Sequence, residues 1–224
     1  MTPAIDEDPV VVSLGDTLLR ESDVRLLSGP FWVNDRLIGF YFEYLHQNKF
    51  DGMDKLCFIS PEVSQFLKLV SPAEIPIFLE PLSLEEKETI LMAVNNAMDP
   101  ESPGGSHWSL LVFTRQAKEF FHLDSSPGLN EDHARKLAKK VHEFLIKKLP
   151  KFSFRFTAVD VLKQNNGYDC GIHTMTHAEE STRHFLVYGN ALGLDDILPE
   201  VVKSKRSEVL ALIDELAETQ PKRS

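Results

Sequence analysis

The segment Gln164–Gly171, with the sequence QNNGYDCG, constrains the fold more than any other part of the chain. It follows a β-like run, Ser153–Leu162, and precedes a helical one, Ile172–Leu186. Its Asn-Gly pair is a strong turn signal, because both residue types tolerate positive φ. Asp169 is placed to cap the helix, which puts Cys170 in the first turn. We therefore predict a strand, a tight turn and a helix that begins at a cysteine.

This position is expected to make the Cys170 thiol reactive. The free N–H groups and the dipole at a helix start favour an anion, and hence a thiolate. Gly171 has no side chain, so a substrate backbone can come close, and the amide of Gln164 can serve as an oxyanion donor. A lone cysteine is more often a buried structural thiol. The three features that converge on Cys170 nevertheless favour a nucleophile, whereas Cys57 lies among apolar residues and is predicted to be structural.

A cysteine nucleophile usually needs a histidine base, which a third group orients. His107 precedes a predicted strand, Trp108–Thr114, which a two-residue turn connects to the strand Glu119–Asp124. In that hairpin, His107 and Asp124 point to the same face as diagonal neighbours. A register shift of two residues would put them directly opposite, and a shift of one would separate them. We predict His107 as the base and Asp124 as its orienting group.

Two alternatives for the other histidines stay open. His122 shares the strand face of Asp124 and is a rival base, although burial is expected inside the strand. Cys170, His173 and His177 lie on one side of the predicted helix and, with a fourth ligand, could bind zinc. No Cys-x-x-Cys pair supports that site, so we expect no metal and no cofactor. The remaining histidines are expected on the surface or in the core, namely His46, His133, His142 and His184.

Charge and cysteine content restrict the class of protein. The net charge of −10 and the pI near 5.3 argue against nucleic acid and suit a partner with basic residues. Two cysteines make a disulfide framework improbable, so we expect a reducing intracellular location, cytoplasmic or nuclear. Met1–Pro9 is polar and acidic, which is unlike a signal peptide, and no apolar run is long enough to span a membrane. We expect a monomer.

The mixture of strands and helices predicts an α+β fold, a single domain over residues 10–219 with flexible tails at 1–9 and 220–224. A helix capped by Asn34 or Asp35 should run to about Asn48. Asp16–Leu27 remains ambiguous between strand and helix. The other expected elements are strands Val10–Leu14 and Thr89–Val94, a loop Asn95–Gly105, helices Glu62–Leu69, Ser71–Phe78 and Asn130–Leu149, and two helical pieces within Asp195–Ala217, broken near Pro199 or Ser204.

These motifs together resemble the catalytic domain of the sentrin/SUMO-protease family, which cleaves ubiquitin-like modifiers. That family has a Gln, five residues and then Asp-Cys-Gly, as in Gln164–Gly171. It has a His-Trp pair at the start of a strand, matched by His107-Trp108, and an Asp about seventeen residues later, matched by Asp124. It also has a Trp-Leu-Asn-Asp segment before its first long helix, and Trp32–Asp35 differs from it by one Val.

The resemblance implies a papain-like cysteine-protease fold, with a central mixed or antiparallel sheet flanked by helices. It implies that Cys170 attacks the carbonyl after a Gly-Gly tail, that His107 and Asp124 act as base and orienting acid, and that Gln164 holds the oxyanion. For substrate binding, it implies a narrow passage between Trp32 and Trp108 beside Gly171, contact of Asp35 with an arginine of the modifier, and a border for the tail at Asn95 and Asn96.

Shorter stretches make the chain most similar to the deneddylase branch, which acts on the neddylation modifier and its conjugates. These are Asp8–Val11, Leu18–Arg20, Ser22–Val24, Phe58–Val63 and Phe78–Leu82. We therefore expect an isopeptidase for that modifier. A SUMO protease of the same family and a catalytically silent modifier-binding module remain the alternatives.

Overall fold

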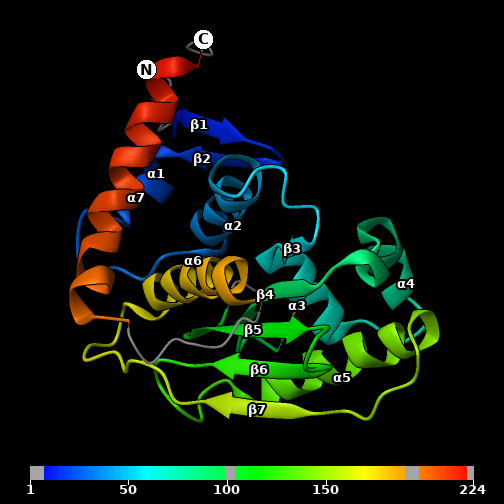
Figure 1. The fold of residues 1–224 in the computed structure, drawn as a ribbon. Coiled ribbons are helices and arrows are strands. Elements are labelled where there is room, and N and C mark those ends of the chain that lie inside the picture. The colour runs from blue at the N-terminus through cyan, green and yellow to red at the C-terminus, as the bar shows by residue number, and fades with distance from the viewer. Residues whose placement is uncertain (1–7, 99–103, 190–196, 221–224) are drawn as a thin grey trace, which may run out of the picture.

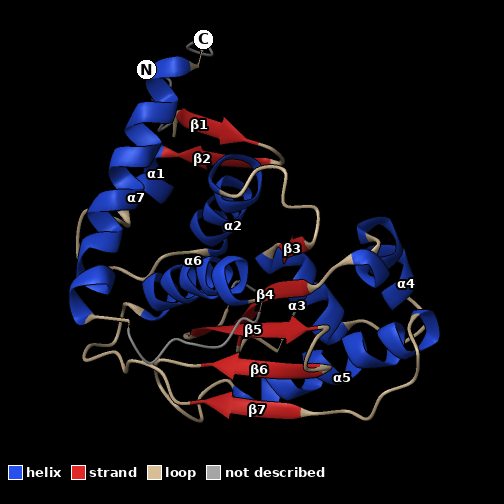
Figure 2. Ribbon diagram, in the orientation of Figure 1, coloured by secondary structure: helices blue, strands red, loops and turns tan. Residues whose placement is uncertain are grey.

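A mixed sheet of five strands lies at the centre of the protein (Figures 1 and 2). The computed structural model describes residues 8–98, 104–189 and 197–220. The strand order is β3-β4-β5-β6-β7, with β3 parallel to β4, β6 parallel to β7, and antiparallel pairing between β4, β5 and β6. The strands are β3 Leu56–Ile59, β4 Thr89–Asn95, β5 Trp108–Thr114, β6 Glu119–Leu123 and β7 Phe156–Val159. The structure confirms the α+β fold.

The two faces of the sheet belong to two separate apolar cores, as the period of two in a strand requires. On β4 and β5, Leu91, Ala93, Leu110 and Val112 join one core. Ile90, Met92, Leu111 and Phe113 alternate with them and join the other. Every residue of β4 is buried, as we expected for a central strand.

Helices α2, α6 and α7 contribute to the first core, and α3, α4 and α5 contribute to the second (Figure 1). Asn34 caps α2 by accepting a hydrogen bond from the backbone N–H of Leu37 at 3.1 Å. The helix continues into a π-helical turn, so the predicted length is confirmed. The bounds are α2 Asp35–Tyr44, the π-turn Leu45–Lys49, α3 Pro61–Leu69, α4 Ile75–Leu79, the 3₁₀ turns Glu80–Leu82 and Leu84–Glu86, α5 Glu131–Lys148, α6 Cys170–Tyr188 and α7 Pro199–Thr219.

The ambiguous N-terminal stretch contains both kinds of element. A separate hairpin pairs β1 Val10–Leu14 with β2 Thr17–Arg20, and α1 Glu21–Arg25 follows directly. The strand over Val10–Leu14 is therefore confirmed. The hairpin packs beside α7, as Figure 1 shows.

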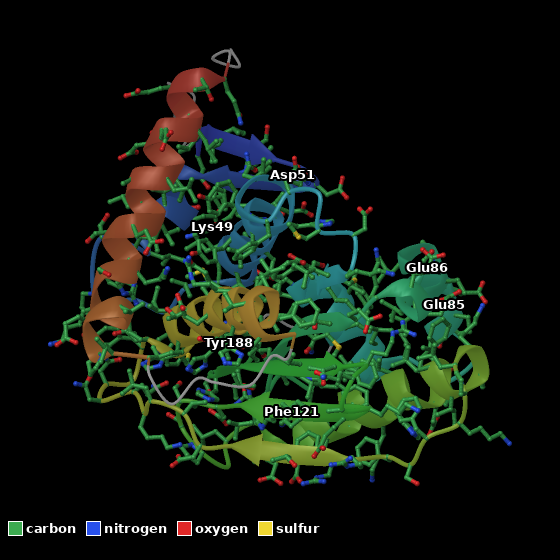
Figure 3. All side chains as sticks on the ribbon, viewed as in Figure 1. Lys49, Asp51, Glu85, Glu86, Phe121 and Tyr188 are labelled. Atoms are coloured by element: carbon green, nitrogen blue, oxygen red, sulfur yellow. The ribbon has the colours of Figure 1, made fainter. Side chains whose placement is uncertain are left out.

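A buried polar network ties α2, α6 and α7 together above the sheet. Lys205 of α7 donates hydrogen bonds to Glu179 of α6 at 2.6 Å and to the Tyr41 hydroxyl at 3.1 Å. Tyr41 in turn donates to Glu179, and Lys49, which is labelled in Figure 3, forms an ion pair with the same carboxylate. Burial raises the pKa of Glu179, but these hydrogen bonds outweigh it and lower the pKa to about 2. The carboxylate therefore stays ionised and holds the three segments in register.

Three predicted elements have different limits. The helix expected over Ser71–Phe78 begins only at Ile75 and ends at Leu79. The strand expected over Ser153–Leu162 is ordered as β7 over four residues only, because β7 pairs on one side, with the short strand β6. The expected break at Ser204 is wrong. The hydroxyl of Ser204 donates to the carbonyl of Val201 within a continuous helix, and Pro199 occupies its first turn, where a missing N–H costs nothing.

The described ends of the chain are fixed at points where we expected loose tails. The carboxylate of Asp8 accepts hydrogen bonds from the N–H and the hydroxyl of Ser22 at 2.9 and 2.6 Å. Gln220 bonds to both backbone groups of Ser13 in β1. The rest of both expected tails, the middle of the expected Asn95–Gly105 loop, and Asp195 with its predicted helix start lie outside the described residues.

No described helix combines the length and the apolar character that crossing a bilayer requires.

Candidate active site

Cys170 is the first residue of α6, as the sequence predicts, and only 3% of its surface is exposed. Asp169 occupies the cap position, but its side chain forms no hydrogen bond with the helix N–H groups. It pairs instead with Arg206 of α7 at 2.7 Å, so the prediction of a side-chain cap is wrong. The N–H groups of the first turn are thus left without a side-chain cap, next to the sulfur.

His107 and Asp124 form the expected pair at the end of the β5–β6 hairpin. The imidazole Nε2 lies 2.6 Å from Oδ1 of Asp124, and both residues are buried. The hairpin has the predicted register, with Thr114 opposite Glu119 around a two-residue turn. Asp124 also accepts a hydrogen bond from the backbone N–H of Ser126 at 2.9 Å. Because Nε2 faces the carboxylate, Nδ1 is the ring nitrogen left for Cys170, whose interaction with the imidazole helps to raise the pKa of His107.

The electrostatics of this group favour a charged histidine. Burial by itself lowers the pKa of His107, but hydrogen bonds and charges from Asp124 and Cys170 outweigh it and raise the pKa to about 9. Burial raises the pKa of the Asp124 carboxyl, whereas its hydrogen bonds with His107 and Ser126 lower it, with a net decrease. At neutral pH, the pair is an imidazolium and a carboxylate. An imidazolium beside a cysteine is the arrangement that cysteine nucleophiles use.

The rival histidine has a different environment. His122 lies inside β6, 2% exposed, with Nε2 at 2.9 Å from the hydroxyl of Ser109. Burial lowers its pKa to about 4, so it is neutral at physiological pH. Cys170 contributes to the raised pKa of His107, whereas burial is the main cause of the lowered pKa of His122. The structure therefore favours His107 over His122.

The zinc alternative finds no support in the part of the chain that the structure describes, where no cluster of three or more His, Cys, Asp or Glu side chains could hold a metal ion. His173 and His177 stack edge to face with ring centroids 5.7 Å apart, and both are buried. Burial lowers the pKa of His173 to about 4 and that of His177 to about 3. They are neutral interior residues of α6.

Asn130 helps to hold the catalytic pair in place. Asn130 is fully buried and donates its amide to the carbonyl of His107 at 3.3 Å and to Ser109 and Val94. Its backbone N–H donates to Oδ2 of Asp124 at 3.3 Å. Asn130 thus contacts both members of the pair. The sequence pattern predicts only that Asn130 begins a helix. No local pattern predicts that its side chain points into the protein.

Gln164 lies at the predicted position beside the helix start. Its Oε1 accepts a hydrogen bond from the Ser125 hydroxyl at 2.7 Å, and its Nε2 donates to the carbonyl of Asn166 at 2.7 Å. The amide carries two N–H bonds, so one remains for a further acceptor. These contacts hold the amide in a defined orientation, as an oxyanion donor requires.

Both tryptophans lie near the helix start. Trp32 is half exposed, and its indole N–H donates to the carbonyl of Gly167 at 2.6 Å. A Cβ added to Gly171 would lie 3.6 Å from Cδ1 of Trp108 and would clash with Cγ2 of Val33. We expected Gly171 to leave room for a substrate, but Val33 occupies the space beside it. The glycine is required by packing of the Trp32–Asn34 segment.

The remaining predicted binding residues are divided between surface and interior. Asp35 is exposed in the first turn of α2. Asn96 accepts hydrogen bonds from the backbone N–H groups of Ser106 and His107 at 2.7 and 3.2 Å, so it helps to fix the base. Asn95 is buried, and its carbonyl accepts a hydrogen bond from Lys68 of α3. The two asparagines therefore position the end of β4 and the start of β5.

Comparison with known proteins agrees with this geometry. The family model described as the Ulp1 protease family, C-terminal catalytic domain, matches residues 32–219. Sentrin-specific protease 8 from Homo sapiens is 42% identical over 212 residues, which cover 94% of this chain and 99% of that protein. NEDD8-specific protease 1 from Arabidopsis thaliana is 31% identical over 219 residues, which cover 94% of this chain and 95% of that protein.

Solved structures share the fold at lower sequence identity. The C-terminal Ulp1 protease domain, solved in complex with SMT3, the yeast ortholog of SUMO, aligns with a TM-score of 0.72 at 18% identity. That alignment covers 96% of this chain and 90% of the solved one. The Ulp1-like SUMO protease catalytic domain from Chaetomium thermophilum aligns with a TM-score of 0.64 at 21% identity over 92% of this chain and 82% of the solved one.

Proposed function

Because the chain belongs to the Ulp1 protease family, we propose that it is a cysteine protease that cleaves after the C-terminal Gly-Gly of NEDD8. The observation that carries the proposal is the buried pair His107–Asp124, joined at 2.6 Å, together with a cysteine at a helix start that helps to raise the pKa of His107. The choice of NEDD8 rests on the Arabidopsis relative, whose name specifies that modifier. The same chemistry cleaves NEDD8 precursors after Gly-Gly and cleaves NEDD8 from the lysine side chains of its conjugates.

The reaction proceeds through a thioester. The Cys170 thiolate attacks the carbonyl carbon after Gly-Gly, and the resulting oxyanion is held by the Gln164 amide and the N–H of Cys170. The C–N bond breaks while the His107 imidazolium protonates the leaving amine. Water then attacks the thioester with His107 as base, which releases the modifier carboxylate and restores the thiol. Asp124 holds the imidazole in orientation throughout.

Substrate selection follows from the two indoles. Trp32 and Trp108 border the helix start, and a passage between two such rings admits glycine but leaves no room for a Cβ. The exposed carboxylate of Asp35 is suited to an arginine near the modifier tail. Binding energy from the folded modifier is then expressed at the cleavage point.

The test uses NEDD8 with a fluorogenic amide at its C-terminus, alongside matched SUMO and ubiquitin substrates. Wild-type protein should cleave the NEDD8 substrate fastest, and Cys170→Ala should abolish cleavage. Cys57→Ala is the matched control, because Cys57 is the other buried free thiol and should leave the rate nearly unchanged. Faster cleavage of SUMO would reassign the modifier.

A separate measurement addresses the silent binding module. An electrophilic NEDD8 probe should form a covalent adduct with wild-type protein and none with Cys170→Ala. Tight binding without any adduct would establish a binding module instead. We also propose that the protein works in the cytoplasm or nucleus, since its chemistry requires a reduced thiol and both of its cysteines are free.

A further inference from the structure

Arg206 of the C-terminal helix α7 lies against residues that adjoin the candidate site. Its side chain is 14% exposed, and it forms an ion pair with Asp169, the residue immediately before Cys170. Nε and Nη2 donate to the same carboxylate oxygen at 2.9 and 2.7 Å. The guanidinium carbon also lies 5.6 Å from the ring centroid of Tyr168. The Nε and Nη2 edge of the guanidinium therefore binds the turn that carries the nucleophile.

The other donors of Arg206 reach a different part of the chain. Nη1 donates to the carbonyl of Leu26 at 2.8 Å, and Nη2 donates to the carbonyl of Phe31 at 2.7 Å. Phe31 directly precedes Trp32, one of the two indoles beside the site. A planar guanidinium can serve these separate acceptors at once, because its donors form a fixed fork. Arg206 thus connects the Trp32 segment to the Cys170 turn.

The turn before Cys170 is cross-linked internally as well. The second carboxylate oxygen of Asp169 accepts a hydrogen bond from Asn166 at 2.7 Å. Asn166 accepts from the backbone N–H groups of Tyr168 and Asp169, both at 3.0 Å, and Gln164 donates to its carbonyl. A displacement of Asp169 would therefore be transmitted to the amide that we assign to the oxyanion.

We propose that Arg206 is a positioning residue that sets the separation between the Trp32 indole and the Cys170 turn. This inference rests on the proposed function, since the separation matters only if a Gly-Gly tail passes there. Trp32 itself contacts the turn through one hydrogen bond to Gly167, which leaves the indole free to tilt unless its backbone is also held. Arg206 holds that backbone at Phe31.

The alternative is an ion pair that only stabilises the fold. It would lower Tm on mutation but leave the choice between substrates unchanged. A positioning role predicts relaxed selectivity, because a widened passage tolerates a Cβ. The discriminating quantity is the ratio of kcat/KM for the native Gly-Gly substrate to that for a substrate with Ala in place of the penultimate Gly.

The experiment measures this ratio for wild-type protein, Arg206→Ala, Arg206→Lys and Lys203→Ala, well below each Tm. Lys203 is exposed on the same helix and is the matched control. Arg206→Ala should lose roughly 10- to 100-fold in kcat/KM on the native substrate, the scale of a small misplacement. Its selectivity ratio should fall by at least about 5-fold. Arg206→Lys should be intermediate, since it keeps the charge but not the fork.

If both Arg206 variants keep the wild-type ratio of kcat/KM for the two substrates, the inference is wrong. If Arg206→Ala does not fold, as circular dichroism would show, Arg206→Lys carries the decision. Failure of the wild-type protein to cleave NEDD8 would contradict the proposed function instead, so the two failures are distinguishable.

Discussion

The Asn130 amide donates to the backbone carbonyl of His107 from a distance of 3.3 Å, inside the protein. The same residue uses its backbone N–H to bind Asp124, so one asparagine contacts both catalytic partners. It belongs to neither strand of the hairpin and immediately precedes α5. The orientation of the base thus depends on a helix packed against the sheet.

Asn130→Ala should lower kcat more than it raises KM. Removing the amide leaves the carbonyls of Val94 and His107 without this donor, at a cost of about 1–3 kcal/mol in the free energy of unfolding. The looser imidazole should reduce kcat by roughly 10-fold. Steady-state kinetics with urea unfolding checks both values. Asn48→Ala, at an exposed position, should change neither. A lower stability with wild-type kcat would show that Asn130 does not position His107.

The activity should fall above about pH 9, because His107 then loses the proton that it gives to the leaving amine. Its pKa is raised in the folded state, so its contribution to stability is complete below the ordinary value near 6.5 and is lost as the pH rises through about 9. Asp124→Asn removes a hydrogen bond and a charge that raise this pKa. The basic limb of the kcat/KM profile should move toward lower pH. If the basic limb of the profile does not move, the titrating group is not His107.

Stability should decrease in mild acid because of the interior histidines His122, His173 and His177. Their pKa values are lowered to about 4, 4 and 3, so the unfolded chain takes up protons that the folded chain does not. Stability is therefore complete above about pH 6.5 and is lost as the pH falls, by about 1.4 kcal/mol per pH unit for each histidine. Urea unfolding between pH 7 and 5 measures the slope. His177→Leu should flatten it, and an unchanged slope would contradict the assignment.

Gly171→Ala should destabilise the protein by roughly 1–3 kcal/mol, because the new methyl group meets Val33 in a packed core. Gly167→Ala is the control in the same segment, since nothing lies within 4 Å of a Cβ there. Val33→Ala should restore part of the lost stability when combined with Gly171→Ala. Thermal unfolding of the single and double variants tests the coupling. If the stability changes of the two single variants simply add in the double variant, contact with Val33 is not the reason that position 171 requires glycine.

Local patterns in the sequence predicted the parts of the site that depend on neighbours in the chain. The position of Cys170 follows from the turn before it and the helical run after it. The approach of His107 to Asp124 follows from the length of one hairpin turn, because strand register is determined by that turn. The element limits failed where pairing with a distant partner decides them, as at β7.

By itself, the sequence determined the nucleophile, its base and acid, the α+β class and the family resemblance, since each depends on short-range periodicity or motif spacing. Only the tertiary structure decided which groups hold them: Asn130 reaching into the hairpin, Val33 against Gly171, and Arg206 against Asp169. The physical reason is that these contacts join separate segments of the chain, and the contacts of Arg206 extend up to 180 residues, to Leu26. A polar residue on a helix carries no local sign of the partner that packing will bring to it.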